Sequence, residues 1–173
     1  MQLRPFADGN RISNMGKTDK SSYTCADTEL SYKQEGIMFK HILLPTDGSE
    51  LSRAAVKNGI LFAKKLGARV TGLSVMPAFH SSINEEKIAR EALDAESYLS
   101  VITKTAMEER IECDILMERS DTPYDTIIWV ADKRGCDLIM MASHGRKGIG
   151  ALLLGSETQK VLTHSKIPVL VYR

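Results

Sequence analysis

The sequence predicts a doubly wound α/β fold, in which helices cover both faces of a five-stranded parallel sheet. Between Met38 and Arg173, five short apolar runs alternate with four segments that have a helical period. Such alternation is typical of parallel strands joined by helices. The apolar runs are nearly continuous, which favours strands that are buried on both faces. Right-handed crossovers then place helices on both sides of the sheet.

The first strand and the first helix have clear boundaries. Residues 41–44 read His-Ile-Leu-Leu and are stopped by the turn residues Pro45-Thr46-Asp47-Gly48, which indicates a buried strand. The next apolar residues recur at helical spacing from Leu51 to Leu66. Ser49 is available as the N-cap of this helix and Gly67 as its C-terminal stop.

The second strand and helix follow the same order. Val70–Val75 is a second apolar run, closed by Met76-Pro77. From Asn84 to about Glu109, apolar residues recur at helical spacing among charged neighbours. This pattern predicts a long amphipathic helix.

The second half of the chain repeats the alternation. Cys113–Met117 suggests a third strand. Thr122 as N-cap, Pro123 at the first helical position and Asp125 three residues after the cap predict a helix that stops at Gly135. The remaining elements are a strand over 137–142, a helix over 156–164 and a strand over 168–172.

Residues 1–37 show no sustained helical or strand period and mix polar with scattered apolar residues. We therefore divide the chain into a disordered extension, 1–37, and a folded domain, 38–173. The extension could also arise from a start codon upstream of a true start at Met38, or be a regulatory tail that folds on binding. It lacks the continuous apolar stretch of a signal peptide.

Composition and charge exclude several classes of function. The 173 residues carry 23 Lys and Arg against 22 Asp and Glu, so net charge gives no reason to expect nucleic acid or an anionic membrane as partner. The apolar stretches are too short for a membrane-spanning helix. The three cysteines, at wide spacing, support neither a disulfide scaffold nor a zinc site. We expect a soluble cytoplasmic protein.

The loops after the first and fourth strands are the expected ligand site, because open parallel sheets bind ligands where strand order reverses. After the fourth strand, Gly145 can turn with positive φ and lets backbone amides approach an anion. Gly155-Ser156 stands where a helix begins, so the free N–H groups of Ser156, Glu157 and Thr158 form an anion site. Arg146 and Lys147 add positive charge. This pattern predicts a cradle for a di- or triphosphate; the alternative is a flexible loop with a solvated basic pair.

These motifs resemble those of the universal stress protein family. The nucleotide-binding branch of that family carries Gly-x2-Gly-x9-Gly-Ser/Thr, and this chain reads Ala142-x2-Gly145-x9-Gly155-Ser156. The family motifs Pro-Thr-Asp and Pro-Val-Leu-Val stand here at residues 45–47 and 168–171. Ala142 departs from the usual glycine, which adds one methyl group near the expected ribose. The resemblance implies a Rossmann-like fold and a bound ATP, ADP or AMP, with Mg²⁺ as an optional companion.

The resemblance also assigns roles to individual residues. Asp47 and the Val75 backbone would hold adenine, while turn formation and helix capping are the alternatives for Asp47 and Thr46. His144 would be either a phosphate contact or a packed or solvated side chain. The remaining pocket and phosphate contacts, the latter largely through backbone amides, would come from Pro45, Thr46, Met141, Ala142, Gly145, Arg146, Gly155, Ser156, Glu157 and Thr158.

Other nucleotide-binding motifs are missing from the sequence. There is no Gly-x4-Gly-Lys-Ser/Thr string, and the first strand is not followed by the dinucleotide fingerprint. No nucleophile and base can be paired: Ser143 and His144 are adjacent, but no orienting acid is identifiable. We therefore expect an ATP-responsive stress regulator with an unknown protein partner. The alternatives are a slow ATPase or phosphotransferase using the same pocket, and a structural dimer that binds no nucleotide.

The last strand is expected at a sheet edge, where Pro168 is tolerated. A bare apolar edge strand such as Val169–Tyr172 would invite aggregation. Members of the family that the chain resembles typically cover it by pairing with a second copy. We therefore expect a homodimer through this strand.

Overall fold

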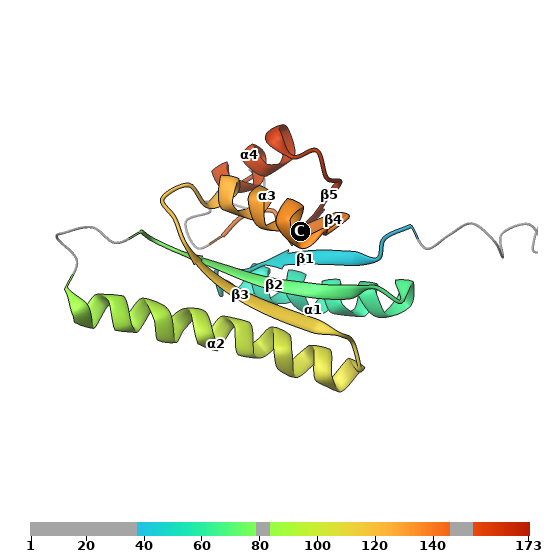
Figure 1. Cartoon of the computed structure of the whole chain (residues 1–173), viewed down its shortest axis with the longest axis horizontal. Coiled ribbons are helices and arrows are strands. Elements are labelled where there is room, and N and C mark those ends of the chain that lie inside the picture. Colours follow the sequence, from blue (N-terminus) through green and yellow to red (C-terminus); the bar gives the residue numbers. More distant parts are fainter. Residues whose placement is uncertain (1–37, 79–83, 146–153) are drawn as a thin grey trace, which may run out of the picture. The chain divides into compact units, whose positions relative to one another are not determined.

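The five strands form one parallel sheet in the order β3-β2-β1-β4-β5 (Figure 1). This computed structural model describes residues 38–78, 84–145 and 154–173. The predicted α/β fold is confirmed. In chain order its elements are β1 (His41–Pro45), α1 (Glu50–Leu66), β2 (Arg69–Met76), α2 (Glu85–Glu109), β3 (Cys113–Arg119), α3 (Pro123–Arg134), β4 (Leu138–Ala142), α4 (Ser156–His164) and β5 (Val169–Tyr172).

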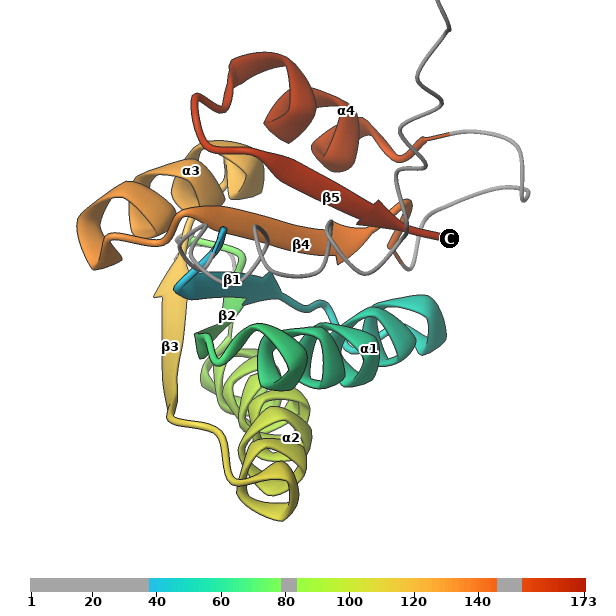
Figure 2. The same ribbon diagram turned by 90° about the vertical axis from the view of Figure 1, so that its right-hand side faces the viewer.

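Helices cover both faces of the sheet, with α1 and α2 on one side and α3 and α4 on the other (Figure 2). Strand β1 shows how the sequence builds two cores, because successive side chains of a strand point to opposite faces. Ile42 and Leu44 lie in the cluster formed with α1 and α2. Leu43, between them, lies in the cluster formed with α3 and α4. All three side chains are fully buried, so β1 is the central strand that an uninterrupted apolar run predicts.

The predicted caps of α1 are present. Ser49 accepts a hydrogen bond from the Ser52 amide at 3.3 Å, and Gly67 ends the helix with a φ of 65°. The predicted boundaries of α3 are also present, with Pro123 at its first position and Gly135 at its end. Thr122 occupies the N-cap position, but its hydroxyl makes no capping bond and instead lies 3.2 Å from the Ser120 hydroxyl.

Strand order reverses between β1 and β4, as predicted. Their pairing covers only Ile42 with Leu138 and Leu43 with Ile139, although both strands continue beyond these residues. The carboxyl ends of β1 and β4 therefore lie at the same edge of the sheet without a continuous ladder between them. This is the position at which open α/β sheets bind ligands.

The remaining expectations concern the ends of the sheet and the rest of the chain. Strand β5 is an edge strand, as predicted. The expected disordered extension, 1–37, lies outside the described residues. Within the ranges given above, no helix is long and apolar enough to cross a membrane.

Candidate functional site

The turn after β1 is held by side-chain hydroxyls. The Thr46 hydroxyl lies 2.6 Å from the Ser52 hydroxyl and accepts from the Gly48 amide at 3.2 Å. The Asp47 carboxylate accepts from the Ser49 amide at 3.1 Å through Oδ1. Thr46 and Asp47 therefore make the turn and lead into the α1 cap, which was the structural alternative to a binding role. These contacts also fix the Asp47 carboxylate in place beside the start of α1.

Gly48 brings α2 against this turn. Its φ of 74° is a conformation that glycine adopts without strain. A Cβ at this position would overlap the ring of Tyr98 on α2. Only glycine allows both this backbone angle and the close approach of the Tyr98 ring. The turn after β1 therefore packs directly against α2.

The backbone of Val75 faces the same place from β2. The Leu73 carbonyl accepts from the Thr46 amide and the Met76 carbonyl accepts from the Ser120 amide, both at 2.8 Å. Backbone groups alternate between the two sides of a strand. Val75 therefore directs its N–H and C=O toward the side of β1. At this point along the sheet β1 has already ended at Pro45. The contact of the Val75 backbone with adenine stays a prediction.

The end of β4 is tied to α4 and to β5. Met141 and Ala142 are buried. The Thr158 hydroxyl donates to the Ala142 carbonyl at 3.0 Å, and the Ser143 amide donates to the Tyr172 carbonyl at 2.7 Å. The Thr158 side chain thus serves the fold, so a contact with a ligand would come from its backbone.

The two predicted glycine bends lie close together. The Gly155 amide donates to the Ser143 carbonyl at 2.8 Å, and a Cβ on Gly155 would lie 3.1 Å from the His144 Cα. A Cβ on Gly145 would overlap the Asp47 carboxylate. The Gly155 amide is therefore bonded within the protein, and the phosphate contact of this residue stays a prediction.

One expectation for Gly145 was wrong. The glycines with positive φ among the described residues are Gly48, Gly67 and Gly135, so Gly145 does not need the left-handed conformation. Its need for glycine comes from the Asp47 carboxylate, which fills the space that a side chain would occupy. The loop after β1 and the loop after β4 therefore touch at this point.

The N-terminus of α4 contains the backbone amides that the sequence predicts to bind an anion. The first amide that finds an acceptor within the helix turn is that of Gln159, which donates to the Gly155 carbonyl at 2.9 Å. The amides of Ser156, Glu157 and Thr158 precede it and have no intrahelical acceptor. Such amides, together with the helix dipole, favour a negatively charged ligand.

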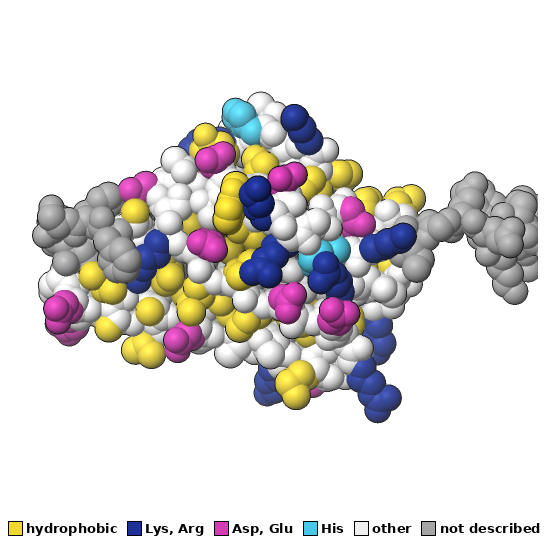
Figure 3. Space-filling model, in the orientation of Figure 1, with side chains coloured by type: hydrophobic (Ala, Val, Ile, Leu, Met, Phe, Trp, Pro, Cys, Tyr) yellow, Lys and Arg dark blue, Asp and Glu magenta, His cyan; other side chains and the backbone are white. Residues whose placement is uncertain are grey.

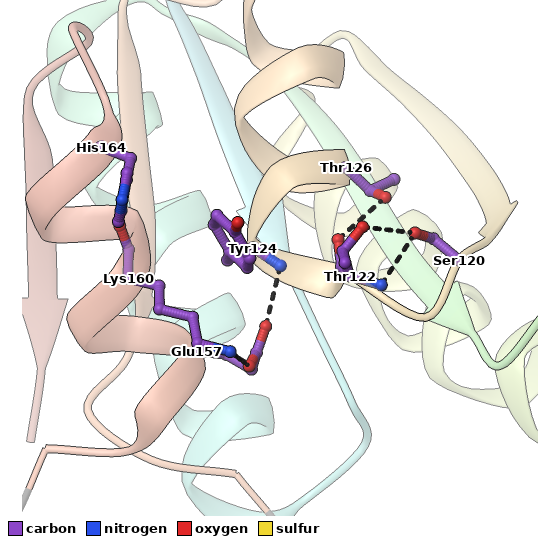
Figure 4. Close-up of polar contacts among 7 residues, drawn as sticks. All are labelled: Ser120, Thr122, Tyr124, Thr126, Glu157, Lys160 and His164. Atoms are coloured by element: carbon purple, nitrogen blue, oxygen red, sulfur yellow. Dashed lines mark hydrogen bonds and ion pairs between the residues drawn. The ribbon is translucent and has the colours of Figure 1, made fainter.

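The Glu157 side chain has a role that the sequence did not reveal. Its carboxylate accepts from the backbone amide of Tyr124 at 2.9 Å and pairs with Lys160 at 2.9 Å (Figure 4). The Lys160 ammonium lies 5.0 Å from the centre of the Tyr124 ring, and the Tyr124 and His164 rings are 5.5 Å apart. Glu157 therefore takes the capping role at α3 that we expected from Thr122. No local pattern reports a contact between residues 33 positions apart.

The neighbouring Ser143 and His144 do interact, since the Ser143 hydroxyl lies 3.1 Å from His144 Nδ1. Ser143 is only 2% exposed, however, so its hydroxyl is not presented to a substrate as a nucleophile would be. In the described ranges, no group of three or more His, Cys, Asp or Glu side chains is arranged to hold a metal ion.

The structure thus gathers most of the predicted residues at one edge of the sheet, and their contacts with a ligand stay predictions. Arg146, a predicted phosphate contact, and its neighbour Lys147 lie outside the described residues. Those brought to the ends of β1, β2 and β4 and the start of α4 are Pro45, Thr46, Asp47, Val75, Met141, Ala142, His144, Gly145, Gly155, Ser156, Glu157 and Thr158.

Comparison with known proteins shows the family of the chain. The model of the universal stress protein family matches residues 38–173, which is the whole folded domain. The chain belongs to the universal stress protein family. Universal stress protein MJ0531 of Methanocaldococcus jannaschii is 32% identical over 145 residues, covering 79% of this chain and 83% of the relative.

Solved structures of universal stress proteins share the fold. The structure of MJ0577, also from Methanocaldococcus jannaschii, superposes with a TM-score of 0.64 at 29% identity, covering 78% of this chain and 96% of that one. The Archaeoglobus fulgidus universal stress protein in complex with dAMP gives a TM-score of 0.58 at 19% identity, covering 79% and 99%. At that identity the second likeness concerns the fold alone.

Proposed function

We propose that this universal stress protein binds an adenine nucleotide at the carboxyl edge of β1 and β4. The observation that carries the proposal is that the Gly145 and Gly155 bends meet beside the start of α4, whose first amides have no acceptor within the helix. The first amides of a helix point along its axis and are suited to bind a phosphate group. We choose an adenine nucleotide because a universal stress protein of the same fold, that of Archaeoglobus fulgidus, forms a complex with dAMP.

The described residues suggest a division of labour. Phosphates would bind the amides of Ser156, Glu157 and Thr158. The adenosine would lie over the ends of the strands, between the Asp47 turn and the Val75 backbone. The Glu157 carboxylate would not compete with the phosphates, because Tyr124 and Lys160 already bind it on the side of α3.

We assign ATP, ADP or AMP as the ligand class, with any Mg²⁺ arriving on the phosphates. In the described ranges no cluster of three or more ligand-type side chains would hold the ion by itself.

Binding would let the protein act as a stress-response regulator in the cytoplasm. We also propose a homodimer through β5, because this apolar strand lies at the sheet edge, where a second copy could pair with it.

The test is to denature the purified protein and identify any released nucleotide by mass spectrometry. Calorimetry with AMP, ADP and ATP then measures affinity on the stripped protein. We expect saturable binding of at least one of the three. If no nucleotide is released and none binds at millimolar concentration, the proposal is wrong.

A further inference from the structure

Strand β3 forms the sheet edge opposite β5, and in the described part of the chain only β2 pairs with it. The Glu112 carbonyl accepts from the Val70 amide, and the Ser120 amide donates to the Met76 carbonyl. Backbone groups alternate along a strand, so the even-numbered residues of β3 face β2. Ile115 and Met117 therefore direct their N–H and C=O groups outward, where a further strand could pair.

An apolar groove runs beside this open edge. It has a volume of about 520 Å³ and lies between α2 and β3, with Leu99, Met107, Ile115 and Met117 among its lining residues. Met107 is 75% exposed, Ile115 46% and Met117 42%. Figure 3 shows hydrophobic side chains gathered along this part of the surface, with Asp and Glu side chains beside them. Exposed apolar side chains on an edge strand are a hazard that proteins usually avoid.

The charges around the groove select the occupant. Glu96 and Glu108 line it on α2, against one lysine, Lys104. Asp114 and Glu118 stand on β3, and the nearby Arg119 is already paired with a carboxylate at 3.3 Å. The edge therefore has an excess of negative charge, which favours a basic partner.

The same acids disfavour a second copy of this chain. In an antiparallel pair of β3 strands centred on Leu116, Asp114 would stand opposite the second copy of Glu118. A register centred on Ile115 would place Glu112 opposite Glu118. Like charges directly opposite one another destabilise a strand pair.

We propose that the β3 edge and its groove bind an extended, basic segment of another protein, with apolar residues at every second position. The segment would add a sixth strand beside β3. Backbone hydrogen bonds to Ile115 and Met117 would supply affinity, and the apolar side chains would fill the groove. The basic side chains would meet Glu118 and Asp114 on the other face. Strand β2 lies between this surface and the ends of β1 and β4, where the nucleotide is proposed to bind.

The probe is a synthetic peptide that alternates valine and lysine over seven residues, the length of β3. We expect it to slow hydrogen exchange of the Ile115 and Met117 amides, measured by NMR, and to leave the already bonded Leu116 amide unchanged. Methylating the backbone nitrogens of the peptide should weaken binding by at least about tenfold. Met117→Lys should weaken it similarly, whereas Leu162→Lys on α4 should not.

Three results would overturn the proposal. One is a methylated peptide that binds as well as the parent, because strand pairing would then not be involved. Another is no change in exchange of the two outward amides at saturating peptide, or no binding. The third concerns oligomeric state: the wild-type protein is a dimer, and Met117→Lys is folded by circular dichroism but monomeric. The β3 edge would then be an interface between two copies of this chain.

Discussion

The Glu157 carboxylate accepts a hydrogen bond from the Tyr124 backbone amide at 2.9 Å, so a residue in the first turn of α4 caps the first turn of α3 (Figure 4). The two helices lie on the same face of the sheet. The amide of Glu157 belongs to the candidate phosphate site, while its side chain is held against α3. Shifts of the α4 N-terminus and of α3 are therefore coupled through one residue.

Removing this cap should destabilise the protein. We expect Glu157→Ala to lower the free energy of unfolding by about 1–2 kcal/mol, because the Tyr124 amide loses its acceptor. Glu157→Gln keeps an acceptor oxygen and should recover at least half of the loss. Urea unfolding of the three proteins makes the comparison.

Lys160→Ala is the matched control for charge. The Lys160 and Glu157 side chains are 47% and 35% exposed, so their ion pair contributes little. If Lys160→Ala costs as much as Glu157→Ala, or Glu157→Gln recovers nothing, the hydrogen bond to Tyr124 is not what stabilises the contact.

The sequence predicts the elements well where the signal is local. The apolar run of β1 and the Ser49 and Gly67 caps of α1 report their structure because neighbouring residues determine it. At β3 the predicted strand ended at Met117, whereas the strand continues to Arg119. An edge strand need not be apolar, so Glu118 and Arg119 gave no strand signal.

The candidate site could be located from the sequence, but its contacts could not be derived. The glycine spacing indicated that residues 145 and 155 serve one site. Residue 145 has to be glycine because the carboxylate of Asp47, almost a hundred residues away, occupies the space beside it. At α3 the Tyr124 amide is bonded by Glu157 and not by the N-cap residue Thr122. Contacts of this kind depend on the packing of whole elements.

Thr158 provides a second test of the site. Thr158→Val should lower the free energy of unfolding by about 1–3 kcal/mol, because the buried Ala142 carbonyl loses its donor. Thr158→Ser keeps the hydroxyl and should be closer to wild type in thermal unfolding. If the serine variant is as unstable as the valine variant, packing of the methyl group matters more than the bond to β4.

Gly145 should be needed for nucleotide binding. Gly145→Val would force the Asp47 carboxylate from its place, and we expect nucleotide affinity by calorimetry to fall at least about tenfold. The matched control is Gly67→Asn, at the turn after α1. No atom lies within 4 Å of a Cβ there, and asparagine tolerates the φ of 65°. Loss of binding in the control, or retention in Gly145→Val, would contradict the site.

The expected homodimer can be tested at β5. Val171 is half-buried and lies outside both described core clusters, so a charge there should spare the fold. We expect Val171→Lys to convert a dimer into a monomer in light scattering, because two buried lysines would face each other near the twofold axis. Met117→Lys at the opposite edge should keep the dimer mass. A wild-type monomer at micromolar concentration would refute dimerisation.

His41 should make stability depend on pH. Its ring is 3% exposed, with Nε2 2.7 Å from the Thr71 hydroxyl. Burial, and then the positive charge of Arg69, lower the pKa of His41 below its usual 6.5; Asp137 and the backbone carbonyls of Arg134 and Gly135 act in the opposite direction without outweighing them.

The unfolded chain therefore binds the His41 proton more readily than the folded protein does. The neutral ring makes its full contribution to the free energy of unfolding above pH 6.5. This contribution falls as the pH drops from 6.5 toward the lowered pKa of the folded state. Urea unfolding at a pH above 6.5 and at one a full unit below it should show this loss. His41→Gln can still bond Thr71 but cannot take up a proton, so its stability should change less between the two conditions. An equal change in both proteins would assign the pH dependence to other groups.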